Sequence, residues 1–373
     1  MKKILVVIGT RPEAIKMAPL IKGFQAQPDL FDLHVCVTAQ HRQMLDQVMN
    51  FFGLTPDSDL DLMEPNQSLS DLSSRLMNGI TTIINGFNPD YVFVHGDTST
   101  AMIAALSSFY AQKKIVHIEA GLRTHNIYSP FPEEANRQII SRLASLHMAP
   151  TGRSQQELLD EKIDKEAITV TGNTVIDALF LGLKIIKESP SQKLLDFKKY
   201  IGDSRVILVT SHRRENQGAG IFEICKALKT IAQEFPDFNI VFPVHLNPKI
   251  LKPVHKELTG IDNIILLEPL DYELFLWMMQ RSYLIITDSG GIQEEAPSLN
   301  KPVIVIREFT ERQEAVDSGA VLLVGNDKDR IVEETSKLII NKSHYDKMAS
   351  AVNPYGDGKA VSQIIDIISS QKE

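Results

Sequence analysis

Residues 1–16 read MKKILVVIGTRPEAIK and begin a pattern that recurs along the whole chain. The apolar run predicts a β-strand, because branched apolar side chains favour extended backbone. Gly9 then permits a tight turn, Thr10 can cap a following helix, and Pro12 fits the first turn of that helix. The apolar run is too short for a signal peptide, so we expect a first strand that leads directly into a helix.

Short runs rich in Val, Ile and Leu alternate with longer amphipathic stretches throughout the sequence. Continuous apolar runs are typical of strands covered by helices on both faces, and strand–helix alternation implies parallel sheets with right-handed crossovers. The sequence therefore predicts an α/β protein with two Rossmann-like doubly wound domains facing a cleft. The predicted strands are residues 3–9, 33–39, 91–96, 114–120, 146–150 and 168–172 in the first half, and 205–211, 239–245, 263–269, 283–288, 302–307 and 321–325 in the second.

The predicted domains are residues 1–172 and 173–373, and the stretch 187–204, which contains Pro190, is the polar seam between the two strand sets. The amphipathic segment 357–371 is expected to form a last helix that can pack back on the first domain. Ligands of open parallel sheets bind beyond the carboxyl ends of the strands, so the polar residues that follow the strands are the candidate site.

Composition narrows the class of protein. The chain has 373 residues, 43% of them apolar and 23% charged, with a formal net charge of −8. This balance is typical of a globular protein and argues against a nucleic-acid partner, which favours a basic surface. The two cysteines, Cys36 and Cys225, lie in apolar segments and are expected to be buried thiols in a reducing compartment. With no predicted membrane segment, we expect a cytoplasmic protein without a membrane partner.

Charged residues follow the strands of the first half. Arg11 and Lys16 lie at a helix start, where an anion is favoured, although ordinary solvated cations at a capped helix fit equally well. Neither a dinucleotide fingerprint nor a phosphate-binding loop with its lysine occurs there. Carboxylates at successive strand and loop ends can converge and shift one another's pKa, as proton-transfer chemistry requires, although each can also serve as a helix cap. They are Asp97, Glu119, Glu133 and Glu134, followed by Arg137.

The second half offers groups suited to a phosphate. His212 and Arg213 follow a strand, where they can meet an anion or form a charged surface turn. His245 follows another strand and, taken alone, fits a structural histidine. The stretch 288–298, DSGGIQEEAPS, joins a strand to a helix, and Ser289, Gly290 and Gly291 can donate hydrogen bonds to a phosphate. A glutamate one turn later suits the hydroxyls of a ribose, whereas Asp288 or Ser289 can alternatively cap the helix.

These motifs together resemble the non-hydrolysing UDP-N-acetylglucosamine 2-epimerases over nearly the whole chain. The resemblance rests on GTRPEAIKMAPL, TAQHRQMLDQV, HGDT, EAGLRT, SPFPEEANR, TGNTVIDAL, HRREN, PVHLNP, TDSGGIQEEAPSL and NPYGDG, in this order. It implies the glycosyltransferase-B fold, a homodimer, and interconversion of UDP-GlcNAc and UDP-ManNAc for bacterial surface-polysaccharide synthesis. Neither a nicotinamide cofactor nor a metal is implied.

The resemblance also implies the reaction and the roles of individual residues. A base removes the C2 proton while UDP leaves C1, giving 2-acetamidoglucal; UDP then adds back and C2 is reprotonated on the other face. The catalytic residues it implies are Asp97, Glu119, Glu133 and His212. The substrate-binding residues it implies are Arg11, Lys16, His41, Arg137, Phe275, Ser289, Gly290, Gly291, Glu295 and Arg312, with Phe275 beside the uracil and Glu295 on the ribose.

Some relatives are activated by UDP-GlcNAc bound beside the active site, and the matching positions here are Gln40, Gln43, Glu133, Arg213 and His245. Asn66 differs from the arginine of some activated relatives, and TERQEA and REFTER differ from the usual TERPEA and RDTTER. Three alternatives remain: a hydrolysing epimerase, a UDP-sugar glycosyltransferase and a non-catalytic UDP-sugar sensor.

Overall fold

The computed structural model describes residues 1–38, 42–64 and 67–371, with residues 42–44 described by their backbone alone. Contacts group the chain into two compact units: unit 1 is Met1–Leu181 with Tyr355–Glu373, and unit 2 is Gly182–Pro354. These bounds differ from the predicted domains 1–172 and 173–373, because α7 (Thr174–Glu188) continues through residue 181 and the C-terminal segment groups with unit 1.

Unit 1 contains a parallel sheet of seven strands among its described residues, in the order β3-β2-β1-β4-β5-β6-β7. Six of these strands confirm the sequence prediction, and β3 is an additional strand of two residues. The strands are β1 (Lys2–Ile8), β2 (Phe31–Val37), β3 (Ser58–Asp59), β4 (Tyr91–His95), β5 (Lys114–Ile118), β6 (Leu146–Ala149) and β7 (Ile168–Val170).

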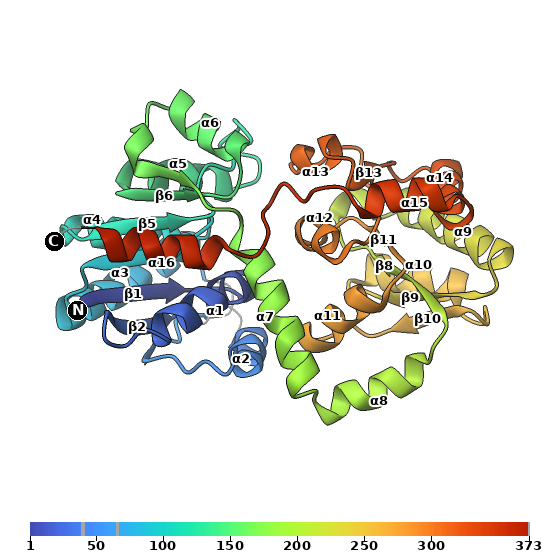
Figure 1. The fold of residues 1–373 in the computed structure, drawn as a ribbon, viewed down its shortest axis with the longest axis horizontal. Coiled ribbons are helices and arrows are strands. Elements are labelled where there is room, and N and C mark those ends of the chain that lie inside the picture. Colours follow the sequence, from blue (N-terminus) through green and yellow to red (C-terminus); the bar gives the residue numbers. More distant parts are fainter. Residues whose placement is uncertain (39–41, 65–66, 372–373) are drawn as a thin grey trace. The chain divides into compact units, whose positions relative to one another are not determined.

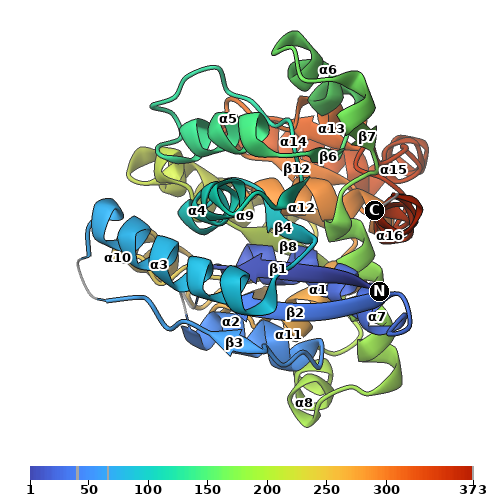
Figure 2. The ribbon, with the colours of Figure 1, turned by 90° about the vertical axis from the view of Figure 1, so that its left-hand side faces the viewer.

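Helices cover both faces of this sheet, as Figures 1 and 2 show. The side chains of α3 and α4 pack on Leu5, Val7, Val92 and Val94 of the strands, and the last helix, α16, packs against α1. The helices of unit 1 are α1 (Arg11–Gln25), α2 (Arg42–Phe51), α3 (Leu69–Phe87), α4 (Ser99–Tyr110), α5 (Glu133–Leu143), α6 (Gly152–Asp160), the first half of α7, and α16 (Ala360–Ser370).

Unit 2 has a parallel sheet of six strands in its described residues, in the order β10-β9-β8-β11-β12-β13, and all six were predicted. The strands are β8 (Arg205–Thr210), β9 (Phe238–Pro243), β10 (Ile264–Leu267), β11 (Leu284–Thr287), β12 (Val303–Val305) and β13 (Val321–Leu323). The helices are α8 (Gln192–Ile201), α9 (Ala219–Glu234), α10 (Pro248–Leu258), α11 (Tyr272–Arg281), α12 (Gly290–Glu295), α13 (Gln313–Asp317), α14 (Lys328–Ile340) and α15 (Lys342–Ala349).

The strand order reverses once in each sheet, between β1 and β4 in unit 1 and between β8 and β11 in unit 2. At such a switch point the connections leave toward opposite faces, which opens a crevice beyond the carboxyl ends of the two strands. In unit 1 the crevice is bordered by the segments after Ile8 and His95, and in unit 2 by those after Thr210 and Thr287. The candidate residues at strand ends therefore lie where this fold binds ligands.

The turn after β1 packs closely against the start of α4. Ile4–Ile8 are all fully buried, as expected of a central strand covered on both faces. A Cβ on Gly9 would stand 2.3 Å from Thr100 Oγ1, so only glycine allows the turn to pass the start of α4. Thr10 caps α1, as predicted.

None of the helices in the described ranges has the apolar run that a bilayer-spanning segment requires.

Candidate active site

Three predicted carboxylates gather at the switch point of unit 1. Asp97 follows β4, Glu119 follows β5, and Glu133 begins α5. Burial is the main cause that raises the pKa of Asp97; Arg137 opposes it, and the charges of Glu119 and Glu133 add to it. Because charges influence one another this way only at short range, the three carboxylates form one acidic cluster.

Helix α5 fixes the orientation of Asp97. The Arg137 guanidinium forms an ion pair with Asp97 Oδ2 and, at 3.1 Å, with Glu134 Oε2. Asn136 Nδ2 donates to the main-chain oxygen of Asp97 at 2.8 Å. Glu134, read from the sequence as a residue of the helix start, is fully buried and also accepts from Thr124 N at 3.0 Å. Glu134 therefore fixes the position of Arg137, which in turn orients Asp97.

Glu119 is held by a different set of groups. Lys16 Nζ forms an ion pair with Glu119 Oε2, and Asn173 Nδ2 donates to the same oxygen at 2.8 Å. His95 Nε2 lies 3.7 Å from it, and burial lowers the pKa of His95 to about 4, so this imidazole is neutral at working pH. The backbone of Glu119 has φ +61°, a left-handed conformation that is uncommon outside glycine and is often found at functional sites.

Glu133 differs from its neighbours because its Oε2 atom is buried and has no hydrogen-bond partner among the described residues. A buried, unpaired carboxylate oxygen is costly, so a ligand that supplies a donor there would be stabilised. Arg11 begins α1 at the same edge and is partly exposed. In the described ranges, no group of three His, Cys, Asp or Glu side chains is arranged to hold a metal ion.

Several predicted positions cannot be placed. Gln40, His41 and Asn66 lie outside the described residues, and so does the side chain of Gln43.

Asp288 organises the switch point of unit 2. Its carboxylate is fully buried and accepts hydrogen bonds from Ser211 Oγ (3.0 Å), His212 N (2.9 Å), Arg213 N (3.0 Å) and Asn216 Nδ2 (2.9 Å). Burial alone would raise the pKa of Asp288, but the hydrogen bond and charge of His212 and the other donors bring it down to about 2. The sequence suggested Asp288 as a possible helix cap; in the structure it fixes the loop after β8 instead.

His212 is oriented by this carboxylate. Its Nδ1 lies 3.1 Å from Asp288 Oδ1, which leaves Nε2 as the nitrogen available to a ligand, and the side chain is 39% exposed. The ring of His245 stacks on it, with centroids 6.2 Å apart. Arg213 is partly buried, and its Nε has no partner in the described part of the chain. The two predicted histidines are therefore in contact.

The glycine turn after β11 lies against an arginine. Ser289 precedes α12, and a Cβ on Gly290 would stand 3.1 Å from the guanidinium carbon of Arg312. Arg312 Nε donates to Glu294 Oε1 at 2.9 Å, so the first glutamate after the turn is paired with a cation. This pairing removes the repulsion that Glu294 would exert on a nearby phosphate. Glu295 follows one position later and, like Glu294, is largely buried.

Two further predicted positions, Gly291 and Phe275, lie within helices. Gly291 lies in the first turn of α12, where an added Cβ would stand 3.6 Å from Glu295 Oε2. Phe275 lies in α11 and is partly buried. Sequence reasoning missed the contacts of Asn136, Asn173, His95 and Asp288, although all four lie within the motifs of the family resemblance. Only the fold shows that the amides of Asn136 and Asn173 contact catalytic candidates and that Asp288 binds the loop of His212.

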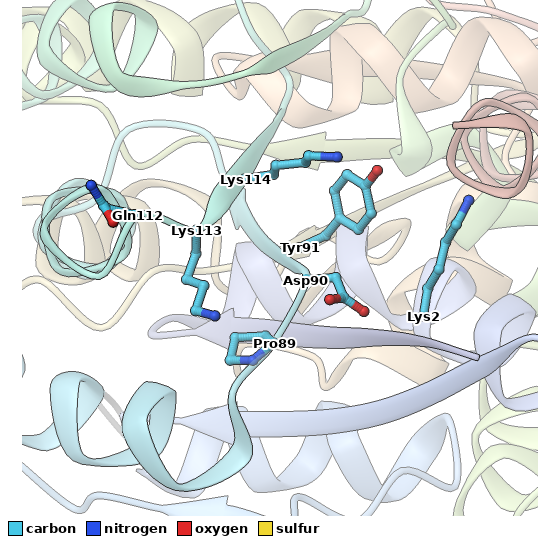
Figure 3. A pocket seen from close by; sticks show the side chains of 7 residues that line it. All are labelled: Lys2, Pro89, Asp90, Tyr91, Gln112, Lys113 and Lys114. Carbon is cyan, nitrogen blue, oxygen red and sulfur yellow. The ribbon is translucent and has the colours of Figure 1, made fainter. Parts of the chain in front are cut away.

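A separate hollow of about 400 Å³ lies at the opposite edge of the sheet of unit 1, at the amino ends of β1, β4 and β5 (Figure 3). Its lysines are already engaged: Lys2 Nζ donates to main-chain oxygens at the end of α16, and Lys114 lies over the Tyr91 ring. No predicted site residue lines it. It is therefore distinct from the candidate site.

The two doubly wound sheets, each with polar residues at its switch point, define the class: α/β proteins with a glycosyltransferase-B-like fold. An Anabaena protein solved in complex with UDP and glucose has this fold, with a TM-score of 0.65 and 16% identity over 100% of both chains. A family model described as UDP-N-acetylglucosamine 2-epimerase matches residues 24–369.

Relatives of much higher identity narrow the class to a family. The UDP-N-acetylglucosamine 2-epimerase of Campylobacter jejuni is 53% identical over 100% of this chain and 98% of its own length. The crystal structure of UDP-GlcNAc 2-epimerase from Neisseria meningitidis, bound to UDP-GlcNAc, matches with a TM-score of 0.90 and 47% identity over 99% of this chain and 100% of that one. The chain belongs to the UDP-N-acetylglucosamine 2-epimerase family.

Proposed function

We propose that this protein interconverts UDP-GlcNAc and UDP-ManNAc by inverting carbon C2 of the sugar without hydrolysing the nucleotide sugar. The observation that carries the proposal is the acidic cluster of Asp97, Glu119 and Glu133, in which burial and then the neighbouring carboxylate charges raise the pKa of Asp97. Family membership, and a relative solved with UDP-GlcNAc, support the identity of the substrate.

The chemistry explains the need for more than one acidic group. The C2 hydrogen is not adjacent to a carbonyl carbon, so enolisation cannot loosen it. In the proposed route a carboxylate takes the C2 proton, the C2–H electron pair forms the C1=C2 bond of 2-acetamidoglucal, and the C1–O bond breaks to release UDP. UDP then adds back to C1, and a second acid delivers a proton to the opposite face of C2. Two faces require two proton-transfer groups.

We assign these two transfers to Asp97 and Glu133. A raised pKa makes Asp97 a stronger base toward the C2 proton, and Arg137 holds it in place. The buried, unpartnered Oε2 of Glu133 is available for the other transfer. Glu119, paired with Lys16, orients the sugar and adds to the negative field around Asp97.

The nucleotide is assigned to unit 2. Ser289, Gly290 and Gly291 would donate to the phosphates, Glu295 would accept from the ribose hydroxyls, and Phe275 would contact the uracil. Arg312, which pairs with Glu294, offsets the negative charge of that glutamate beside this turn. His212, whose Nδ1 faces Asp288, would with Arg11 stabilise the charge that grows on the diphosphate as the C1–O bond breaks.

We infer regulation and assembly from the resemblance to the family. We propose that a second UDP-GlcNAc activates the enzyme through Gln40, Gln43, Arg213 and His245, and the stacking of His245 on His212 supports a link to the catalytic histidine. The enzyme is proposed to be a cytoplasmic homodimer that supplies UDP-ManNAc for cell-surface polysaccharide.

The direct test is incubation of the protein with UDP-GlcNAc alone, followed by chromatography of the products. A stable mixture of UDP-GlcNAc and UDP-ManNAc is expected. Steady accumulation of free sugar and UDP would identify a hydrolysing enzyme, and no conversion at all would leave a binding protein; either result overturns the proposal.

A further inference from the structure

Glu13 is a buried carboxylate that the proposed mechanism does not use. It lies in the first turn of α1 and is 2% exposed, within the GTRPEAIK stretch at the switch point of unit 1. Its Oε2 atom accepts from Gly9 N at 3.1 Å and Thr10 N at 2.6 Å, which completes the reciprocal cap of the helix. Its other oxygen, Oε1, accepts from Thr98 Oγ1 at 2.8 Å.

Capping explains only half of this arrangement. A glutamine at the same position can serve such a cap as well as a glutamate, without burying a charge. Burial raises the pKa of Glu13 to about 7, despite the hydrogen bonds from Thr98, Thr10 and Gly9 that lower it. Burying the Glu13 carboxylate therefore costs free energy. The hydrogen bond that it accepts from Thr98 is the contact that a glutamine would not reproduce.

Thr98 needs an acceptor because its hydroxyl is already used on its other side. Thr98 Oγ1 accepts from Ala101 N at 3.0 Å and so caps α4, which leaves its hydrogen to be donated. Glu13 Oε1 receives that hydrogen. A glutamine that kept its oxygen on the cap would present an NH2 group to Thr98, so the hydroxyl would lose the acceptor for its own hydrogen.

Thr98 directly follows Asp97, and hydrogen bonds from other residues also hold the main chain around Asp97. His117 Nε2 lies 2.8 Å from the main-chain oxygen of Gly96, and Asn136 Nδ2 donates to that of Asp97. Glu13 supplies the remaining anchor and ties it to α1, the helix that carries Lys16.

We propose that Glu13 is a positioning residue for the epimerisation: through Thr98 it holds the Asp97 carboxylate in the orientation required for proton transfer at C2. The proposal rests on the function proposed above. Glu13 itself touches neither sugar nor nucleotide in this account, so its loss should slow proton transfer and leave nucleotide binding unchanged.

The test compares Glu13→Gln with the wild type in D2O, following deuterium incorporation at C2 of UDP-GlcNAc, together with kcat, KM and the calorimetric melting temperature at pH 8. The expected result is a fall of about tenfold in kcat and in exchange, the size of one lost hydrogen bond, with KM within about twofold. The melting temperature should stay the same or rise, because the variant no longer buries a charge.

Thr98 variants provide the matched comparison. Thr98→Val should slow exchange to a similar degree, Thr98→Ser should restore it, and the double variant Glu13→Gln/Thr98→Val should be no slower than the slower single variant. Wild-type exchange in Glu13→Gln overturns the positioning role while leaving the proposed function intact. Exchange rates that fall in parallel with the melting temperature, together with additive effects of the Glu13 and Thr98 substitutions, also overturn the positioning role. Absence of exchange in the wild type overturns the proposed function itself.

Discussion

Replacing Asp288 with Asn should destabilise unit 2 and disorganise the loop that carries His212. The carboxylate accepts from a hydroxyl, two main-chain N–H groups, a side-chain amide and the His212 ring. An asparagine keeps one acceptor oxygen and turns an NH2 group toward the remaining donors. If the amide oxygen takes the place of Oδ2, it keeps the four donors there, and the NH2 group then faces Nδ1 of His212 in place of the acceptor Oδ1.

The structure sets the size of this effect. The pKa of Asp288 falls from 3.8 to about 2, and at about 1.4 kcal/mol per pKa unit the ionised carboxylate contributes about 2 kcal/mol to folding. Asparagine is neutral and lacks this contribution, in which the hydrogen bonds to the charged carboxylate are already included. We therefore expect Asp288→Asn to lower the free energy of unfolding of unit 2 by about 2 kcal/mol at pH 7.

The assay is urea denaturation followed by tryptophan fluorescence, because the single tryptophan, Trp277, lies in α11 of unit 2. Since the folded pKa of Asp288 is below its ordinary value, its contribution is complete above pH about 4 and is lost as pH falls toward about 2. The difference between wild type and variant should therefore shrink over that range. Asp327→Asn, which alters an exposed cap of α14 that asparagine can also form, is the control and should change stability by less than about 0.5 kcal/mol. A difference at pH 7 no larger than in this control would refute the reasoning, and so would one that does not vary with pH.

Three further changes test other contacts. Arg137→Gln should move the acid limb of the pH–rate profile to higher pH, because Arg137 lowers the pKa of Asp97 and the base must be ionised; an unmoved limb in the exchange assay would contradict this. Arg312→Ala should destabilise unit 2 by about 3–5 kcal/mol in the Trp277 urea assay, because the largely buried Glu294 loses its guanidinium partner, and adding Glu294→Gln should recover part of the loss; equal stability of the single and double variants would count against the pairing. Gly9→Ala should lower stability by about 1–3 kcal/mol in calorimetry, since its Cβ would clash with Thr100; a variant as stable as the wild type would show that the turn can relax.

The strands could be predicted from the sequence because central parallel strands are continuous apolar runs. Strand β3 was missed for the opposite reason. Ser58 and Asp59 are polar, and they form a strand only because Cys36 and Val37 of β2 offer free edge positions for pairing. Such a strand depends on its neighbour more than on its own residues, so local patterns do not reveal it.

The sequence indicates candidate site residues, but the contacts between them could not be predicted from it. Asp288 looks like a helix cap in the sequence, and it bonds to the segment after Thr210 because β8 and β11 are neighbours in the sheet although they are far apart in the chain. Likewise, the pairing of Glu294 with Arg312 depends on where the turn after β12 returns. Contacts of this kind depend on which strands are neighbours in the sheet. The sequence pattern predicts the fold class but not these individual contacts.

The most direct test of the account is deuterium incorporation at C2 of UDP-GlcNAc in D2O, measured by NMR for the wild type, Asp97→Asn and Glu133→Gln. We expect the wild type to exchange the C2 hydrogen and each variant to exchange it at least about 100-fold more slowly, while it remains folded and still binds UDP. Exchange at the wild-type rate in both variants would contradict the assignment of proton transfer to this acidic cluster.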